Sequence, residues 1–132
     1  MAHELSMDAD GYLQVRLSGD MEKTDIDAYL KALAPFLQAA TSDNPLHIML
    51  DAAEVGMLSS YGRKNLIELN RDIRIGNVAV VRPTRVFRVL GSFIKKATKR
   101  DNIRFFLSQA EAKNWLAQNR ERTPLIEDGQ YG

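Results

Sequence analysis

Strand-like and helix-like segments alternate along this chain, and their order constrains the fold more than any other feature. Residues 12–18 carry leucine or valine at every second position, which is the period of a half-buried strand. Residues 3–7 form a second short strand before it, and the turn-forming residues 8–11 join the two. Three strand–helix units follow, so the sequence predicts a small α/β domain with a mostly parallel sheet covered by helices.

The first helix has a predicted start and a predicted irregularity. Thr24, followed three positions later by Asp27, has the sequence of a helix cap. Pro35 lies inside the same pattern and is expected to kink the helix or to end it early. The apolar side chains at helical spacing are Ile26, Tyr29, Leu30, Leu33 and Leu37.

Each of the three later units begins with a short apolar strand. Asp51 is expected at the end of the first of these strands, and His47 within it is expected to be a half-buried structural residue. Gly76-Asn77 is expected to separate the second helix from the next strand. The predicted strands are residues 46–50, 78–81 and 103–107. The predicted helix caps are Ser59 or Ser60, then Thr84, then Ser108.

Length and composition bound the organisation and the chemistry. With 132 residues, of which 45% are apolar, the chain suits one domain over residues 1–119, followed by a polar tail at 120–132. Because cysteine is absent, disulfides, thiolate metal sites and cysteine nucleophiles are excluded. Only His3 and His47 are histidines, too few for most histidine metal sites. We therefore expect no metal and no cofactor.

Apolar run lengths and the first residues bear on location. The longest apolar runs are far shorter than the ~20 residues of a membrane span. The first eleven residues lack the basic and apolar regions of a secretory signal. The sequence therefore predicts a cytoplasmic protein.

Charge is segregated along the chain although the formal net charge is only +1. Residues 1–60 hold 3 basic and 10 acidic side chains, whereas residues 61–104 hold 12 basic and 3 acidic ones. Such asymmetry concerns partners rather than fold. Two interpretations stay open: ordinary surface ion pairs in the folded chain, or a one-sided basic surface that meets an acidic partner or an anionic lipid.

The segment LDAAEVGMLSSYG, residues 50–62, resembles the signature of STAS domains, which have the SpoIIAA-like fold of bacterial anti-sigma-factor antagonists. Asp51 matches the family's strand end, Val55 and Leu58 its apolar positions, and Gly62 its glycine. The segments VAVVRPTRVFRVLGSF and IRFFLSQAEAKNWL are similar to its last two strand–helix units. The resemblance spans roughly residues 13–116. It implies a mixed, mostly parallel sheet and a regulatory module whose protein partner is an anti-sigma factor or a kinase.

One position departs from the family's pattern. The serine that the partner kinase phosphorylates in the family stands just before the glycine, and here that position is Tyr61. The family's aspartate is Ser59, and only Ser60 matches a serine. The usual phosphoserine switch is therefore not implied, and Ser59 and Ser60 are the remaining candidates for it.

The start of the second helix is the first candidate site. A helix N-terminus presents free amide groups and the positive end of a dipole, and Arg63 and Lys64 could pair with a phosphate on Ser60. The competing interpretation is a serine that only caps the helix. Asp51 is expected to accept hydrogen bonds from loop amides or from the start of the following helix rather than to act as an acid or base. The candidate partner-binding or phosphorylation residues are Asp51, Ser59, Ser60, Tyr61, Gly62 and Arg63.

The third helix, residues 84–99, is the second candidate site. Its apolar stripe is wide and is interrupted by basic residues, as in helices that rest on anionic membranes. If the helix swung away from the sheet, it would also open a pocket for a small apolar ligand. The competing interpretation is a stripe packed on the sheet with solvated cations, and a homodimer is left open. The candidate residues are Arg85, Phe87, Arg88, Phe93, Lys95, Lys96 and Lys99.

Catalysis and nucleic-acid binding have little support in the sequence. The chain has no glycine-rich phosphate loop, no nucleophile elbow and no cluster of metal ligands. No nucleic-acid recognition motif accompanies the basic segment. The sequence therefore predicts a non-enzymatic protein that binds a protein partner. The alternative is a lipid-binding or apolar-ligand-binding protein, located peripherally at the inner face of the membrane.

Overall fold

Five strands form one sheet in the order β1-β2-β3-β4-β5, in a computed structural model that describes residues 3–119. β1 pairs with β2 antiparallel, and all other neighbours are parallel, which confirms the predicted mixed, mostly parallel sheet. The predicted tail at 120–132 lies outside the described residues. The elements in chain order are β1 His3–Met7, β2 Leu13–Met21, α1 Lys23–Gln38, β3 Leu46–Leu58, α2 Ser60–Arg71, β4 Ile75–Val81, α3 Arg85–Thr98, β5 Ile103–Phe106 and α4 Gln109–Gln118.

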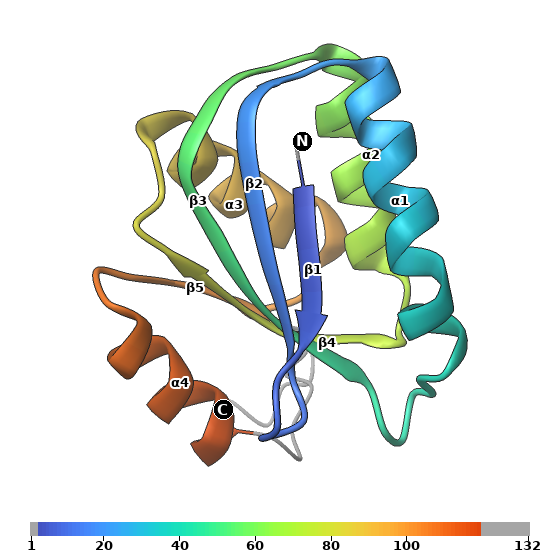
Figure 1. The fold of residues 1–132 in the computed structure, drawn as a ribbon, viewed down its shortest axis with the longest axis vertical. Helices are drawn as coiled ribbons and strands as arrows, with labels where there is room; N and C mark the ends of the chain where they lie inside the picture. The colour runs from blue at the N-terminus through green and yellow to red at the C-terminus, as the bar shows by residue number, and fades with distance from the viewer. Residues whose placement is uncertain (1–2, 120–132) are drawn as a thin grey trace.

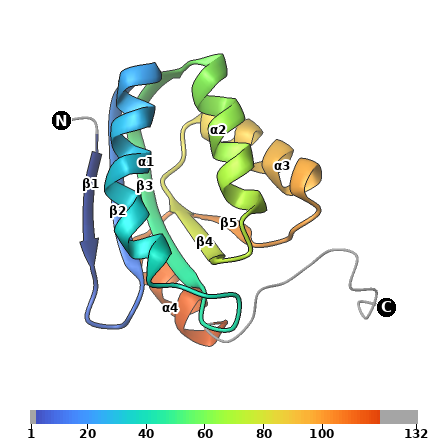
Figure 2. The same cartoon turned by 90° about the vertical axis from the view of Figure 1, so that its right-hand side faces the viewer.

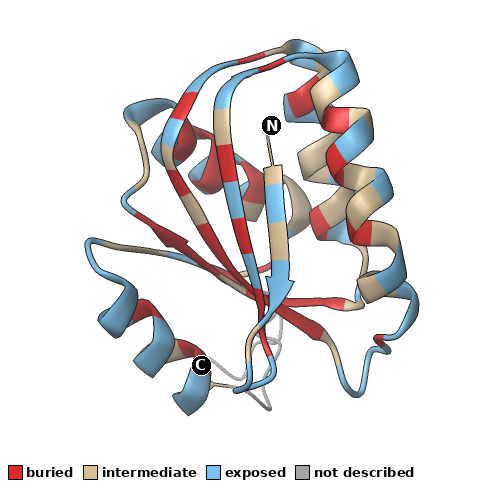
Figure 3. Cartoon of the chain, in the orientation of Figure 1, coloured by how far each residue is buried: buried red, intermediate tan, exposed pale blue. Residues whose placement is uncertain are grey.

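Helices cover the two faces of the sheet unequally. α1, α2 and α3 lie together, and α4 lies apart from them (Figures 1 and 2). The larger core forms between the sheet and the first three helices, and alternate residues along the first part of β2 are buried (Figure 3). A smaller core forms where α4 packs on the sheet through Ala112 and Leu116. The sheet face over β1 and β2 therefore keeps its polar side chains in solvent.

The start and the course of α1 differ from the sequence prediction. Helix α1 begins at Lys23 with Glu22 as its cap, so the prediction of Thr24 as the cap was wrong. The backbone amide of Glu22 donates to Asp25 Oδ2 at 3.0 Å, and this bond fixes the first turn. The helix does not end at Pro35 but continues to Gln38, because Tyr29 and Leu33 hold it in the core.

Strand β3 is much longer than predicted. It does not end at Asp51 but continues to Leu58. The reason is β2, which is itself nine residues long and pairs with β3 as far as Met21 opposite Leu58. Two register shifts interrupt this pairing, and they remove the regular period-two pattern that identifies a strand in sequence.

Strand β4 also begins earlier than predicted. Gly76 and Asn77 lie inside it rather than in a break before it. The backbone amide of Asn77 donates to Nδ1 of His47, in the neighbouring strand β3, at 2.9 Å. His47 is buried, and a Cβ atom added to Gly76 would stand 2.5 Å from its ring, so glycine is required there.

A buried polar network fixes the end of α2 to the starts of β4 and β5. The side-chain amides of Asn70 and Asn102 donate to each other at 3.2 and 2.9 Å, and Asn102 also donates to the carbonyl of Gly76 at 2.8 Å. Arg100 Nη1 donates to the Asn70 carbonyl at 2.8 Å, and Nη2 to that of Ile75 at 2.6 Å. Because buried polar groups cost free energy unless they are paired, each member of this network depends on the others.

Replacing Asn102 should therefore destabilise the fold strongly. We expect Asn102→Ala to lower the free energy of unfolding by about 2–4 kcal/mol, because Asn70 Oδ1 and the Gly76 carbonyl lose the hydrogen bonds that Asn102 donates to them in the interior. Asn114→Ala, at an exposed position of α4, is the matched control and should change it by less than about 0.5 kcal/mol. Urea unfolding of both variants measures this. Equal losses would contradict a stabilising role of the network.

Candidate functional site

The start of α2 lies where β2 and β3 end, beside the start of α1 (Figure 1). Ser59 is the cap of α2, and its Oγ accepts the backbone amide of Gly62 at 3.1 Å. Its own amide donates to the Met21 carbonyl at 3.2 Å, which joins it to the end of β2. Ser59 therefore has a structural role, whereas Ser60 is exposed at the first position of the helix.

Gly62 lets α2 approach α1 closely. A Cβ atom at this position would lie 2.9 Å from Leu58 Cδ1 and 3.1 Å from side-chain carbons of Ile26. The glycine is buried, so the resemblance to the family's glycine at this position is explained by packing. It offers no contact to a ligand.

Arg63 holds the connection between β3 and α2. Its Nη1 donates to the Leu58 carbonyl at 2.7 Å, and its Nη2 donates to Ser60 Oγ at 3.2 Å. An anionic group on Ser60 would therefore meet a guanidinium that already contacts the serine. Lys64, the other cation considered from the sequence, is exposed and forms no ion pair with another described residue.

Tyr61 is tied to α1. Its hydroxyl donates to Asp27 Oδ1 at 2.5 Å, and Lys23 donates to Asp27 Oδ2 at 2.7 Å. The Lys23 ammonium also lies 4.8 Å from the centre of the Tyr61 ring. The hydrogen bond from Lys23, and then that from Tyr61, lower the pKa of Asp27, and Asp27 in turn raises the pKa of Tyr61. The residue at the family's phosphoserine position is thus engaged within the fold.

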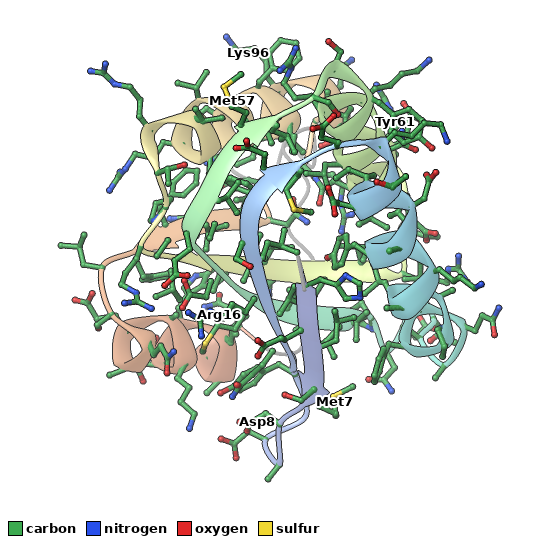
Figure 4. All side chains as sticks on the ribbon, turned by 45° about the horizontal axis from the view of Figure 1, so that its top comes forward. Met7, Asp8, Arg16, Met57, Tyr61 and Lys96 are labelled. Atoms are coloured by element: carbon green, nitrogen blue, oxygen red, sulfur yellow. The ribbon has the colours of Figure 1, made fainter. Side chains whose placement is uncertain are left out.

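The sequence reasoning missed both partners of Tyr61. Lys23 and Asp27 are four positions apart on one helix, which is a recognisable ion-pair spacing. Nothing in the sequence, however, indicates that α1 and α2 bring Tyr61 to this pair. Figure 4 shows this end of the molecule, with Tyr61 labelled.

Asp51 lies apart from the other candidate residues of the first site. It is in the middle of β3, about 25 Å of strand away from Ser59 at the usual rise per residue. Its Oδ2 accepts from Arg82 at 2.6 Å and its Oδ1 accepts the Ala53 amide at 3.0 Å. The structure therefore brings Ser59, Ser60, Tyr61, Gly62 and Arg63 together but leaves Asp51 outside this group.

A polar groove that the sequence reasoning did not identify surrounds Asp51. It lies on the sheet face that α4 leaves uncovered and has a volume of about 380 Å³. Arg16, labelled in Figure 4, pairs there with Glu54 at 3.0 Å, and Arg82 pairs with Asp51. Because these charges are neutralised by one another, the groove presents no uniform potential to a charged ligand.

Helix α3 divides its apolar residues between the core and the solvent. The first group is Phe87, Leu90, Gly91 and Ile94, which are buried, so Phe87 belongs to the core and not to a binding surface. The second group is Val86, Val89 and Phe93, which are 45%, 66% and 59% exposed. The predicted wide stripe is therefore two stripes, of which only the second is free to bind.

The basic residues predicted for the third helix also differ in their surroundings. Lys95 lies 3.8 Å from Asp101, and Lys99 is the left-handed cap after the helix rather than part of it. Arg88 lies over the ring of Phe105, 5.9 Å from its centre. Arg85, Arg88 and Lys96 are the exposed cations within the helix itself.

Beneath α3 lies a small apolar cavity. It has a volume of about 70 Å³ and is lined by side chains of α2, α3 and the sheet, among them Leu66, Phe87 and Leu90. Ligand pockets usually measure about 300–1,000 Å³. With α3 in this position, the cavity holds only a few atoms.

Within residues 3–119, no group of three or more histidine, aspartate or glutamate side chains is arranged to hold a metal ion. None of the helices in that range combines the length and the apolar character that a bilayer crossing requires.

Removing the Tyr61 hydroxyl tests the link between α1 and α2. In Tyr61→Phe we expect the pKa of Asp27 to rise towards its ordinary value, by less than in Lys23→Met, because the hydrogen bond from Lys23 is the larger cause of the lowering. Because the folded pKa of Asp27 is lowered, its stabilisation is present at neutral pH and is lost as the pH falls through that pKa. Carbon-detected NMR titration of the Asp27 carboxyl measures the shift. An unchanged pKa in Tyr61→Phe would show that the bond does not form in solution.

Solved structures with the same fold share little sequence with this chain. A protein of the DUF3478 family from Shewanella loihica PV-4, with a SpoIIAA-like fold, has a TM-score of 0.68 at 18% identity, and the match covers 87% of this chain and 92% of that one. The anti-sigma factor antagonist SpoIIAA in its unphosphorylated form has a TM-score of 0.66 at 13% identity, with 89% and 97% covered. An anti-sigma factor antagonist from Mycobacterium paratuberculosis has a TM-score of 0.60 at 16% identity, with 87% and 94% covered.

These similarities confirm the predicted SpoIIAA-like fold. No curated protein matches the chain. The family model for SpoIIAA-like proteins matches residues 12–117, which include every element from β2 to β5 and most of α4. The chain therefore belongs to the SpoIIAA-like family.

Proposed function

We propose that the chain is a non-enzymatic regulatory module that binds a protein partner through the start of α2 and the adjacent helix α3. The observation that carries this proposal is the environment of Ser60. It is exposed, its Oγ lies 3.2 Å from Arg63 Nη2, and the Ser59 cap and the Tyr61–Asp27 bond hold the turn around it. A fixed turn that displays one exposed hydroxyl beside a cation suits recognition by a protein.

The side chains at this site do not support a catalytic role. Ser60 Oγ contacts a guanidinium and not a general base, so it is not activated as a nucleophile. Asp51 is bound by Arg82 and by the Ala53 amide. The groups needed to transfer a proton to or from a substrate do not converge at the start of α2.

The fold suggests the kind of partner. Two solved structures with this fold are anti-sigma factor antagonists. We therefore propose an anti-sigma factor or a related kinase as the partner class. Because Tyr61 occupies the family's phosphoserine position and is bound to Asp27, any phosphate-dependent switch in this chain would use Ser60.

A charge at Ser60 should disturb this interaction. We expect Ser60→Asp to reduce the amount of bound partner at least tenfold, as measured by quantitative mass spectrometry of proteins retained from a cell extract on the immobilised chain. The negative charge lies at the first position of a helix, where it is tolerated, so the fold is preserved. Ser42→Asp, in the exposed loop between α1 and β3 at the other end of the molecule, is the matched control. Identical partners for wild type and both variants would remove the start of α2 from the mechanism.

A second candidate function is association with an anionic membrane through α3. The observation that favours it is the exposed row Val86, Val89 and Phe93 beside basic side chains. Binding of a small apolar ligand would in addition require α3 to leave the sheet, because the cavity of about 70 Å³ is too small for a lipid.

Vesicle flotation tests the membrane function. If α3 docks on lipid, the protein should float with vesicles that contain phosphatidylglycerol and not with pure phosphatidylcholine. Lys96→Glu should then weaken flotation by more than roughly fivefold, because it removes one positive charge and adds a negative one. Lys113→Glu in α4 is the control, since that residue lies on a different helix. Unchanged flotation of Lys96→Glu, or no flotation of the wild type with either kind of vesicle, would reject this function.

A further inference from the structure

The exposed row on α3 has the spacing of a helix-packing seam. Val86, Val89 and Phe93 are separated by three and then four residues, so they form one line along the helix. This is the spacing with which a second helix packs against a first. The line is distinct from the buried row of the same helix, which already packs on the sheet.

The width of this row favours a helix over a bilayer. Helices that lie in a membrane interface insert a broad apolar face into the lipid. In α3 the broad face is used by the core, through Phe87, Leu90 and Ile94. The exposed apolar row is three side chains long and one side chain wide. These dimensions match the contact line of a single partner helix.

The cations around this row differ from most others in the chain. Eight basic residues elsewhere or at the helix end form ion pairs, and these are Arg16, Lys23, Arg71, Arg74, Arg82, Lys95, Arg104 and Lys113. In contrast, Arg85, Arg88 and Lys96 have no carboxylate of residues 3–119 within ion-pair distance. Arg63 and Lys64 of the neighbouring helix α2 also lack one. Of the seven exposed cations in residues 3–119 that form no ion pair, five therefore lie on α2 and α3, and the other two are Lys31 of α1 and Lys99 after α3.

This charge determines what can cover the row. A second copy of the chain would place Arg85, Arg88 and Lys96 against the same cations, which like-charge repulsion opposes. A partner with carboxylates beside an apolar line would neutralise them. We infer that α3 binds an acidic amphipathic helix, laid along Val86, Val89 and Phe93 with its aspartate or glutamate side chains against Arg85, Arg88 and Lys96. This inference rests on the proposed function and specifies the chemistry of the partner.

A designed peptide serves as the probe. It is a fluorescein-labelled helix of about five turns with leucine at alternating spacings of three and four and glutamate at the flanking positions. A peptide of the same composition without the periodicity separates shape from charge, and a third with lysine in place of glutamate reverses the charge. Fluorescence anisotropy at low salt measures the dissociation constants. We expect the first peptide alone to bind the full chain.

Variants of exposed residues locate the binding. Val89→Asp and Phe93→Asp should each weaken binding at least tenfold, whereas Leu107→Asp, which alters an equally exposed apolar residue after β5, should not change it. The double variant Arg88→Glu/Lys96→Glu should lose the glutamate peptide and gain the lysine peptide. Thermal melting checks that each variant is folded. Because an unfolded variant would not gain affinity for the lysine peptide, this gain distinguishes a lost binding site from a lost fold.

Several results would overturn the inference. They are the absence of binding by the periodic glutamate peptide, equal binding of the non-periodic peptide, or equal affinities for wild type and Phe93→Asp. Flotation with anionic vesicles that Phe93→Asp abolishes, without peptide binding, would assign the row to a membrane instead. The extract experiment with Ser60→Asp is independent of these results. If Ser60→Asp loses partners in the extract but the peptide does not bind, only this inference is rejected. If the peptide binds but Ser60→Asp has no effect in the extract, only the role of the α2 start is rejected.

Discussion

The parallel pairing of β2 with β3 is the interaction on which the rest of this structure depends. Because β3 follows β2 as far as Leu58, the chain reaches the start of α2 at the same end of the sheet where α1 begins. This position allows Gly62 to pack on Ile26 and Tyr61 to reach Asp27. Had β3 ended at Asp51, neither contact would form, and the exposed serine would have no fixed surroundings.

Much of the fold could be predicted from the sequence because helices and buried strands carry periodic patterns. The caps Ser59, Thr84 and Ser108 are confirmed, each accepting a backbone amide three residues further on. The end of β3 could not be predicted, because Ala52, Ala53 and Gly56 are small and the register shifts interrupt the alternation. A strand that pairs with a long neighbour can form with a weak hydrophobic pattern in its own sequence. Such pairing is a tertiary effect, which the local sequence does not show.

The candidate sites were only partly accessible from the sequence, for a related reason. Local chemistry identified the cap, the exposed serine and Arg63, which all lie within one helical turn. It did not identify Lys23 and Asp27, which approach Tyr61 across 34 residues of sequence or more. The helical pattern of α3 likewise gave one broad stripe, and only packing against the sheet determines that Phe87 is buried while Phe93 is exposed.

At the start of α2, three of four consecutive residues are held by the fold and one is exposed. Ser59 is committed to the cap, Tyr61 to α1 and Gly62 to packing, so Ser60 alone of these four can change its contacts without disturbing the fold. A charge added there acts on Arg63 first, because that guanidinium bridges Ser60 and the Leu58 carbonyl. Its effect would then be electrostatic and local, altering the basic surface of α2 and α3 while the backbone stays in place. A partner attracted by that positive charge is the one most sensitive to its neutralisation, which connects the exposed serine with the unpaired cations of α3.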